Sequence, residues 1–153
     1  MRIDIRAFLV SIPVVNPPPL TLTADTLPRA GFWIRVAAAF LDFLLVAIPS
    51  AILGFFHEGP GPMFLLLVAY HCAMWKYKGT TIGGVICNLK VVRLDDRPID
   101  WGVALVRSLT AFLSVMVVGL GFIWVAFDDD KQSWHDKIAG TTIVRVPKGT
   151  PLI

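Results

Sequence analysis

One long apolar run, Phe32–Phe56, constrains the fold more than any other part of the chain. It reads FWIRVAAAFLDFLLVAIPSAILGFF and contains two ionisable side chains, Arg35 and Asp42. A helix over these 25 residues is about 37 Å long, and the hydrocarbon core of a bilayer is about 30 Å thick. The run therefore predicts a membrane-spanning helix. Pro49 lies inside it and predicts a kink, because proline removes one backbone donor.

Arg35 and Asp42 are seven residues apart, which is two helical turns, so both lie on one face of this helix. Arg35 is near the start, where its long side chain is expected to reach the lipid headgroups. Asp42 lies about 10 Å deeper, where a carboxylate costs about 2.5–3.5 kcal/mol unless it is neutral, paired or facing water. Asp42 is therefore a candidate functional residue. The alternative is that it hydrogen-bonds a neighbouring helix and fixes packing.

The composition indicates an integral membrane protein. Of the 153 residues, 56% are hydrophobic and 16% are charged, whereas soluble domains are about 25% charged. The formal net charge of +3 fits a basic cytoplasmic rim, and the sequence has no basic cluster interleaved with aromatics, so no nucleic-acid partner is expected. Cys72 and Cys87 are interpreted as packing residues. No metal or other cofactor is expected.

Three regions follow from this pattern: a flexible tail over residues 1–28, a membrane domain over 29–147 and a C-terminal tail over 148–153. The first region contains three consecutive prolines, which favour extended backbone, and whether all of it belongs to the translated protein is left open. Its apolar run, Ala7–Val15, is too short for a spanning helix and is broken by Pro13. No small-residue cleavage pattern follows at the right distance, so a signal peptide is not expected.

The second apolar run, Pro62–Trp75, follows a short polar turn over residues 57–61 that contains His57. The run is short for a span, but Trp75 and the following Lys76 can extend it at the membrane surface. His71 lies inside the run. It either joins a polar site with Asp42 or donates to a backbone carbonyl.

Residues 79–100 predict short elements separated by turns. Glycines at the start permit a sharp change of direction, and Ile82–Leu89 is expected to form a short interfacial helix. Leu89–Leu94 is rich in β-branched residues and predicts a strand. Asp100 is well placed to cap the helix that begins at Trp101.

The third apolar run, Val103–Phe127, has Arg107 near its start and two glycines at its midpoint, in Val118–Gly121. It is either one spanning helix or a helix that breaks at the glycines and returns, because each half is too short to cross alone. Arg107 either pairs with Asp136 or binds lipid phosphate.

In the C-terminal part, Ser133–Ala139 predicts a short helix that ends at a glycine. Thr141–Val146 predicts a strand that could pair with Leu89–Leu94 if both lie on the same side of the membrane. The preceding run of three aspartates, 128–130, is interpreted as a solvated helix end, with a divalent cation as the alternative.

Lysine and arginine counts predict the topology. Three precede Arg35, none lies in the 57–61 turn, five lie in 76–102 and four follow position 128. The positive-inside rule therefore leaves only the 57–61 turn outside the cytoplasm. This distribution favours a broken or re-entrant third segment over a third full crossing.

Three stretches together resemble the RDD family of bacterial membrane proteins, and the resemblance covers roughly residues 28–146. They are Arg35 with Asp42, the segment GTTIGGVICNLKVV, and GLGFIWVAFDDDKQSWHDKIAGTTIV. The family is named for one arginine and two aspartates, which match Arg35, Asp42 and Asp136. The sequence departs where the family often has a Gly-Lys pair, since Gly84 stands at the basic position. The resemblance implies a membrane protein of unsettled function, for which transport, including cation–proton exchange, has been proposed.

These observations predict an all-α membrane protein: a small bundle of two to three transmembrane helices, a short or re-entrant helix and a small cytoplasmic β element. We expect a multi-pass protein of the bacterial inner membrane that transports an ion or small ligand, such as a proton or monovalent cation. The alternative is an accessory or assembly protein that binds another membrane protein. The chain is not expected to be an enzyme; its expected partners are the lipid bilayer and either a second copy or another membrane protein. The candidate functional polar residues are Arg35, Asp42, His71, Arg107, His135 and Asp136.

Overall fold

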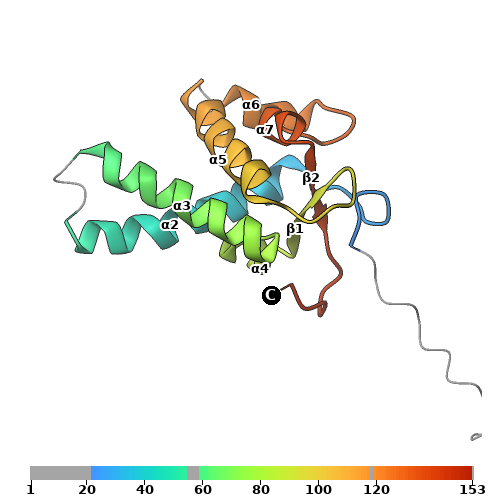
Figure 1. Ribbon diagram of the computed structural model, residues 1–153, viewed down its shortest axis with the longest axis horizontal. Helices are drawn as coiled ribbons and strands as arrows, with labels where there is room; N and C mark the ends of the chain where they lie inside the picture. Colours follow the sequence, from blue (N-terminus) through green and yellow to red (C-terminus); the bar gives the residue numbers. More distant parts are fainter. Residues whose placement is uncertain (1–21, 55–58, 118, 153) are drawn as a thin grey trace, which may run out of the picture.

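The computed structural model describes residues 22–54, 59–117 and 119–152, which form six α-helices and one two-stranded sheet (Figure 1). In chain order the elements are α2 (Phe32–Ile52), α3 (Pro60–Lys78), α4 (Ile82–Ile86), β1 (Leu89–Arg93), α5 (Trp101–Met116), α6 (Leu120–Ile123), the 3-10 helix η2 (Trp124–Ala126), α7 (Trp134–Ile138) and β2 (Thr141–Arg145). Most of the expected N-terminal tail, His57 and Val118 lie outside the described residues.

Helix α2 confirms the first predicted helix, although it ends at Ile52 rather than Phe56. Among the described residues, it is the one unbroken helix that is long and apolar enough to cross a bilayer. Only 17% of the most apolar 18-residue stretch of α2 is buried inside the protein. Trp33 and Ile52 are each 80% exposed. A core helix of a soluble protein is mostly buried, so this exposed apolar surface fits contact with lipid.

Helix α3 is longer than the predicted run, because it begins at Pro60 and continues through two lysines to Lys78. It ends at Gly79, which has a φ of +65° and adopts the left-handed conformation common after a helix. Figure 1 shows α2 and α3 running side by side as a helical hairpin. The Phe64 ring of α3 packs edge-to-face on the Phe112 ring of α5, with 4.9 Å between centroids.

The third apolar run is broken, as one of the two predicted alternatives required. Helix α5 begins after Asp100, whose carboxylate accepts a 2.8 Å hydrogen bond from the Val103 N–H, so the predicted cap is confirmed. Gly119 has a φ of +71°, and α6–η2 leaves α5 at an angle of 108°. This bend allows α7 to pack back against α5.

The predicted strand pairing is confirmed. Strands β1 and β2 are antiparallel, with Val91 opposite Ile143, and each ends one residue before its predicted end. The segment before α2 extends this sheet, since the Ala30 N–H donates to the Ile143 carbonyl at 2.8 Å. The sheet therefore joins two parts of the chain to β2: the segment before α2, and β1 between α4 and α5.

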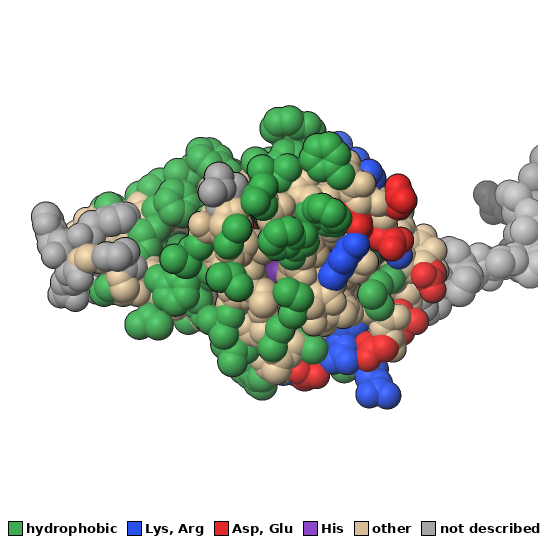
Figure 2. All heavy atoms as spheres, turned by 90° about the horizontal axis from the view of Figure 1, so that it is seen from above, with side chains coloured by type: hydrophobic (Ala, Val, Ile, Leu, Met, Phe, Trp, Pro, Cys, Tyr) green, Lys and Arg blue, Asp and Glu red, His purple; other side chains and the backbone are tan. Residues whose placement is uncertain are grey.

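Polar and apolar surfaces are segregated along the molecule. In Figure 2, hydrophobic side chains cover much of the visible face, and most charged side chains gather toward one end. Ion pairs such as Arg93–Asp100, at 2.8 Å, contribute to the charged end near the sheet. The apolar surface includes exposed side chains from several helices and the end of η2, among them Phe40, Leu65, Leu113, Met116 and Phe127. This distribution suits a bundle that is embedded in a membrane up to its charged end.

Candidate functional site

Helices α2, α3 and α5 surround a cavity of about 310 Å³. Most of its lining is apolar, and Figure 2 shows a histidine side chain between surrounding hydrophobic ones. Five of the six residues singled out from the sequence line this cavity: Arg35, Asp42, His71, Arg107 and His135. The sixth, Asp136, is not part of the lining but forms ion pairs with both Arg35 and Arg107.

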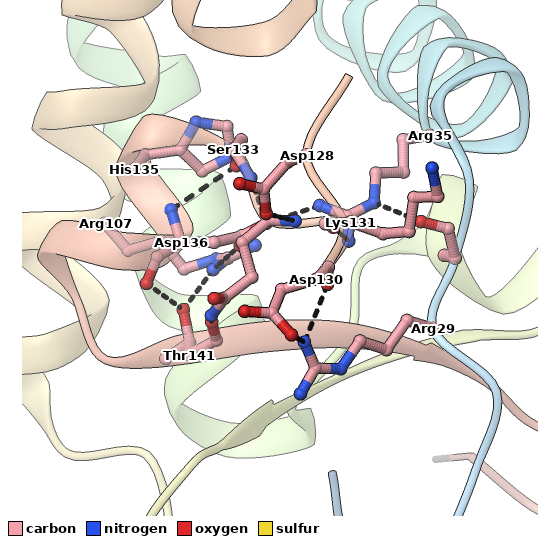
Figure 3. Close-up of polar contacts among 12 residues, drawn as sticks. Arg29, Arg35, Arg107, Asp128, Asp130, Lys131, Ser133, His135, Asp136 and Thr141 are labelled. Atoms are coloured by element: carbon pink, nitrogen blue, oxygen red, sulfur yellow. Dashed lines mark hydrogen bonds and ion pairs between the residues drawn. The ribbon is translucent and has the colours of Figure 1, made fainter. Parts of the chain in front are cut away.

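Asp136 is the centre of a fully buried ion-pair network (Figure 3). Its Oδ1 accepts from Nη1 of Arg107, and its Oδ2 accepts from Nη1 of Arg35. The Ser133 N–H also donates to Oδ2, at 3.1 Å, and the Ser133 hydroxyl accepts from the Asp136 N–H, which makes a capping box at the start of α7. Of the two predicted partners for Arg107, the structure has Asp136.

Arg35 differs from its predicted position, because its side chain is buried and does not pair with Asp42. Besides Asp136, it donates from Nε to the Ala30 carbonyl at 3.0 Å and from Nη2 to the Lys131 carbonyl at 2.5 Å. The prediction that this guanidinium reaches the headgroups was therefore wrong. The physical reason is that helical side chains lean toward the N-terminus, so a first-turn arginine covers the segment before its own helix.

The network carries an excess of one positive charge at neutral pH. Burial would raise the pKa of Asp136, but the guanidiniums of Arg107 and Arg35 outweigh burial and hold it well below its ordinary value. The pKa of His135 is lowered to about 3, mainly by burial; Arg107 and Arg35 add to this effect and Asp136 opposes it. The imidazole is therefore neutral, and two arginines face one carboxylate.

Arg107 has donors that the network does not use. Its Nη1 donates to Asp136 and to Oγ1 of Thr141, and its guanidinium lies 4.7 Å from the centroid of the Trp75 ring. Within the described parts of the chain, neither Nε nor Nη2 of Arg107 has a hydrogen-bond partner, and the same holds for Nδ1 of His135. These buried groups all belong to residues that line the cavity.

Asp42 holds the start of α4 against α2. Its Oδ1 accepts from the Tyr70 hydroxyl at 2.6 Å and from the Gly83 N–H at 2.8 Å. The Tyr70 hydroxyl in turn accepts from the Ile82 N–H at 2.9 Å, so the two side chains satisfy two of the free donors at this helix start. Gly83 has no room for a side chain, because a Cβ would lie 2.2 Å from the Ala38 carbonyl oxygen.

The other residues discussed in the sequence analysis make local hydrogen bonds, apolar contacts or ion pairs. Nδ1 of His71 bonds the Leu67 carbonyl at 2.9 Å, which was the backbone alternative in the sequence analysis. Cys72 is buried in an apolar cluster with Trp75. In the 128–130 run, Asp128 pairs with Lys137. Over residues 22–54, 59–117 and 119–152, no group of three or more His, Cys, Asp or Glu side chains is placed to hold a metal ion.

Tyr70 bonds the candidate residue Asp42 and was missed by sequence reasoning. A tyrosine in an apolar run needs a partner for its hydroxyl, and an aspartate in the neighbouring helix supplies one. That combination was visible in the sequence. Gly83 was recognised as a turn residue, whereas the structure shows that its role is close helix packing.

Comparison with known proteins identifies the family of this chain. The model of the RDD family matches residues 62–140, just over half of the chain. This chain belongs to the RDD family. The RDD match begins within α3, so it contains Arg107 and Asp136 and starts after Arg35 and Asp42.

Several curated proteins are similar to this chain. "Uncharacterized protein YckC" of Bacillus subtilis (strain 168) is 33% identical over 138 residues, covering 78% of this chain and 87% of that protein. "Uncharacterized membrane protein YteJ" of the same organism is 30% identical over 138 residues, covering 75% of this chain and 80% of that protein. "Proline-rich antigen" of Mycobacterium leprae is 28% identical over 90 residues, covering 54% and 36% respectively. No solved structure matches the chain at a significant level.

Proposed function

We propose that this RDD-family membrane protein is a multi-pass protein of the bacterial inner membrane that binds an ion or small ligand inside its bundle and transports it. One observation carries the proposal: the cavity between α2, α3 and α5 is lined by apolar side chains together with Arg107, Asp42 and His71. Ionisable residues at such a depth are costly, and their usual place is a substrate or ion pathway.

The strand pairing and the charges support a specific topology for this function. Because β1 pairs with β2, the segment after α3 and the end of the chain lie on one side of the membrane. In the proposed topology α2 crosses the membrane and α3, which is less apolar, returns with Lys76 and Lys78 at the membrane surface. The α5–α6 segment enters and returns at the 108° bend. The 57–61 turn has no lysine or arginine, whereas 76–102 and the chain after 128 have nine, and this distribution supports a cytoplasmic position for the sheet.

An accessory role is the second candidate, and one observation favours it. Both family aspartates hold other segments of the protein: Asp42 holds α4, and Asp136 joins α7 to two arginines. Polar residues used in this way stabilise a scaffold that a second copy or another membrane protein could bind.

Flux in liposomes separates the two functions. Purified full-length protein is reconstituted at known density, and internal pH is followed after a gradient of sodium, potassium or lithium is imposed. Transport predicts a pH change that exceeds that of empty liposomes and scales with protein density. Folded protein that gives no flux with any of the three cations would replace the transport proposal with the accessory one.

A further inference from the structure

The guanidinium of Arg107 is used on one side and free on the other. Its Nη1 donates to Asp136 and Thr141. Nε and Nη2 have no partner among the described residues, although the side chain has no exposed surface. In a planar guanidinium, Nε–H and one N–H of the outer nitrogen point the same way and form a two-pronged donor edge. This edge matches the two oxygens of a carboxylate or phosphate.

The free edge belongs to a residue that lines the cavity, and an aromatic ring covers one face of its guanidinium. The Trp75 ring covers one face, with 4.7 Å between the guanidinium carbon and the ring centroid. Arg107 and His135 both line the 310 Å³ cavity, and Nδ1 of His135 is a second buried group without a partner in residues 22–54, 59–117 and 119–152. Nε2 of His135 bonds the Ser133 hydroxyl at 2.9 Å, and when that hydroxyl is the donor, Nδ1 carries the ring proton.

The net charge of the Arg35–Arg107–Asp136 network favours a negatively charged ligand. Arg35 and Arg107 share one carboxylate, Asp136, and His135 is neutral. An anion at the free edge would balance the remaining positive charge in a site shielded from water. A cation beside Arg107 would meet two guanidiniums, and the Asp136 carboxylate already bonds both of them. The other carboxylate of the cavity, Asp42, bonds a tyrosine hydroxyl and the start of α4.

The rest of the cavity lining favours a ligand whose remaining part is apolar. Its lining includes the side chains of Phe43, Leu67, Phe112, Val115 and Phe122. Its volume is at the lower end of the range of small-molecule pockets, about 300–1,000 Å³. Inorganic phosphate would fill only the polar end and would leave this apolar lining without contacts.

We propose that the free Nε–Nη2 edge of Arg107 binds a carboxylate or phosphate group whose alkyl chain occupies the cavity between α2, α3 and α5. The proposal deepens and rests on the proposed function, because it names the class of ligand that the cavity takes. Arg107 is the anchor of the oxyanion, His135 is a further donor, and the apolar lining contacts the chain.

Binding is tested with the full-length protein in nonionic detergent. The probes are decyl phosphate, decanoate, decanol with the same chain length but no charge, and inorganic phosphate. Dissociation constants are measured by tryptophan fluorescence, because Trp75 lines the cavity. Decyl phosphate or decanoate should bind at least tenfold more tightly than decanol or inorganic phosphate. Equal binding of decanol, or no binding of either charged chain, would overturn the proposal.

Two substitutions locate the site. Arg107→Lys keeps the charge that faces Asp136 but removes the two-pronged edge, and should weaken binding at least tenfold. Ala111→Leu fills the cavity from α5 and leaves the ion pairs intact, so it should also abolish binding. The control, Ala37→Leu, changes an exposed alanine outside the cavity lining and should bind as the wild type does. If Arg107→Lys does not fold, the alanine pair still decides: unchanged binding by Ala111→Leu would refute the location.

Two further arms separate the source of the ligand and the two proposals. Nanodiscs containing phosphatidic acid, compared with phosphatidylcholine, should raise the melting temperature if a membrane lipid is the ligand, whereas decanoate should do so in both if the ligand is a free acid. Binding of the charged chains without flux of either the cations or these chains in liposomes would keep the oxyanion site and remove the transport proposal. Cation flux without such binding would do the reverse.

Discussion

The Asp42 carboxylate accepts a hydrogen bond from the Gly83 backbone N–H at 2.8 Å, across 41 residues of sequence. This contact connects Asp42, the one acidic residue of α2, to the start of α4. Both groups are buried, and the Tyr70 hydroxyl bonds the same carboxylate oxygen. The aspartate is therefore both an acceptor for the fold and a polar group in the cavity wall, and substitutions can distinguish these two roles.

Replacing Asp42 separates charge from hydrogen bonding. Asp42→Asn keeps an oxygen acceptor for Tyr70 and Gly83, so we expect the detergent melting curve to show a loss below about 1 kcal/mol. Asp42→Leu leaves the buried Gly83 N–H without an acceptor, at about 1–3 kcal/mol, and also removes the acceptor of the half-buried Tyr70 hydroxyl. If this carboxylate carries a proton or cation, the Asn variant should lose coupled flux while it remains folded. Undiminished flux in that variant would exclude Asp42 as the carrier.

Gly83→Ala tests the close approach of α4 to α2. The added Cβ would lie 2.2 Å from the Ala38 carbonyl oxygen, which is backbone and cannot rotate away. We expect overpacking to destabilise the protein by about 1–3 kcal/mol and to lengthen the contact with Asp42. Gly31→Ala is the matched control, because no atom lies within 4 Å of its added Cβ. Equal melting temperatures for both variants would contradict this packing.

Asp136→Asn tests the buried network. It leaves two guanidiniums facing a neutral amide, and removing one partner of a buried ion pair costs about 3–5 kcal/mol. Asp130→Asn makes the same substitution in an exposed pair with Arg29, where the expected loss is about 0–1 kcal/mol. Chemical or thermal denaturation in detergent measures both. A loss at Asp136 no larger than that at Asp130 would contradict the importance of the network.

The pH dependence of stability should reveal His135. Burial lowers its pKa to about 3 in the folded protein, whereas an unfolded imidazole titrates near about 6.5. As the pH falls through 6.5, the unfolded state binds the proton first, so stability falls by up to about 1.4 kcal/mol per pH unit. Asp136 has a lowered pKa, so its contribution is present above about pH 4 and is lost only below it.

Between about pH 6.5 and 4.5, the difference between the wild type and a His135 variant therefore reports the contribution of this histidine. Melting temperatures measured across this range should fall less steeply for His135→Gln than for the wild type. Parallel curves would show that the imidazole is protonated in the folded state, which burial among two arginines opposes.

Cysteine labelling tests the side on which the sheet lies. In a background with Cys72→Ala and Cys87→Ala, the single substitutions Gly61→Cys and Lys148→Cys place thiols at exposed positions. A membrane-impermeant reagent should label intact cells at position 61 and should label position 148 only after lysis. Labelling of position 148 in intact cells would mean that the α5–α6 segment crosses fully.

The local features of the fold could be predicted from the sequence because each depends on near neighbours. The apolar run of α2, the Asp100 cap, the two strands and the break at Gly119 all have signals within a few residues. The sequence could also indicate which polar residues belong together, since five of the six line one cavity.

The partners of those residues could not be predicted in the same way. The shared helix face of Arg35 and Asp42 suggested that they interact, but each bonds a different distant segment. Arg35 reaches Asp136 over 101 residues, and nothing local in either segment specifies that distance. Tertiary packing decides such pairs, so a common helix face establishes proximity without establishing a bond.

The same separation of 101 residues has a consequence for biosynthesis. At about 5–20 residues per second, Asp136 leaves the ribosome on the order of 5–20 seconds after Arg35. Throughout that interval, α2 enters the bilayer with a guanidinium whose carboxylate has not yet been made. The phosphates of the headgroup region are the available counterions, so the nascent helix starts with its first turn at the membrane surface. We therefore expect Arg35 to exchange lipid phosphate for Asp136 when α7 is made.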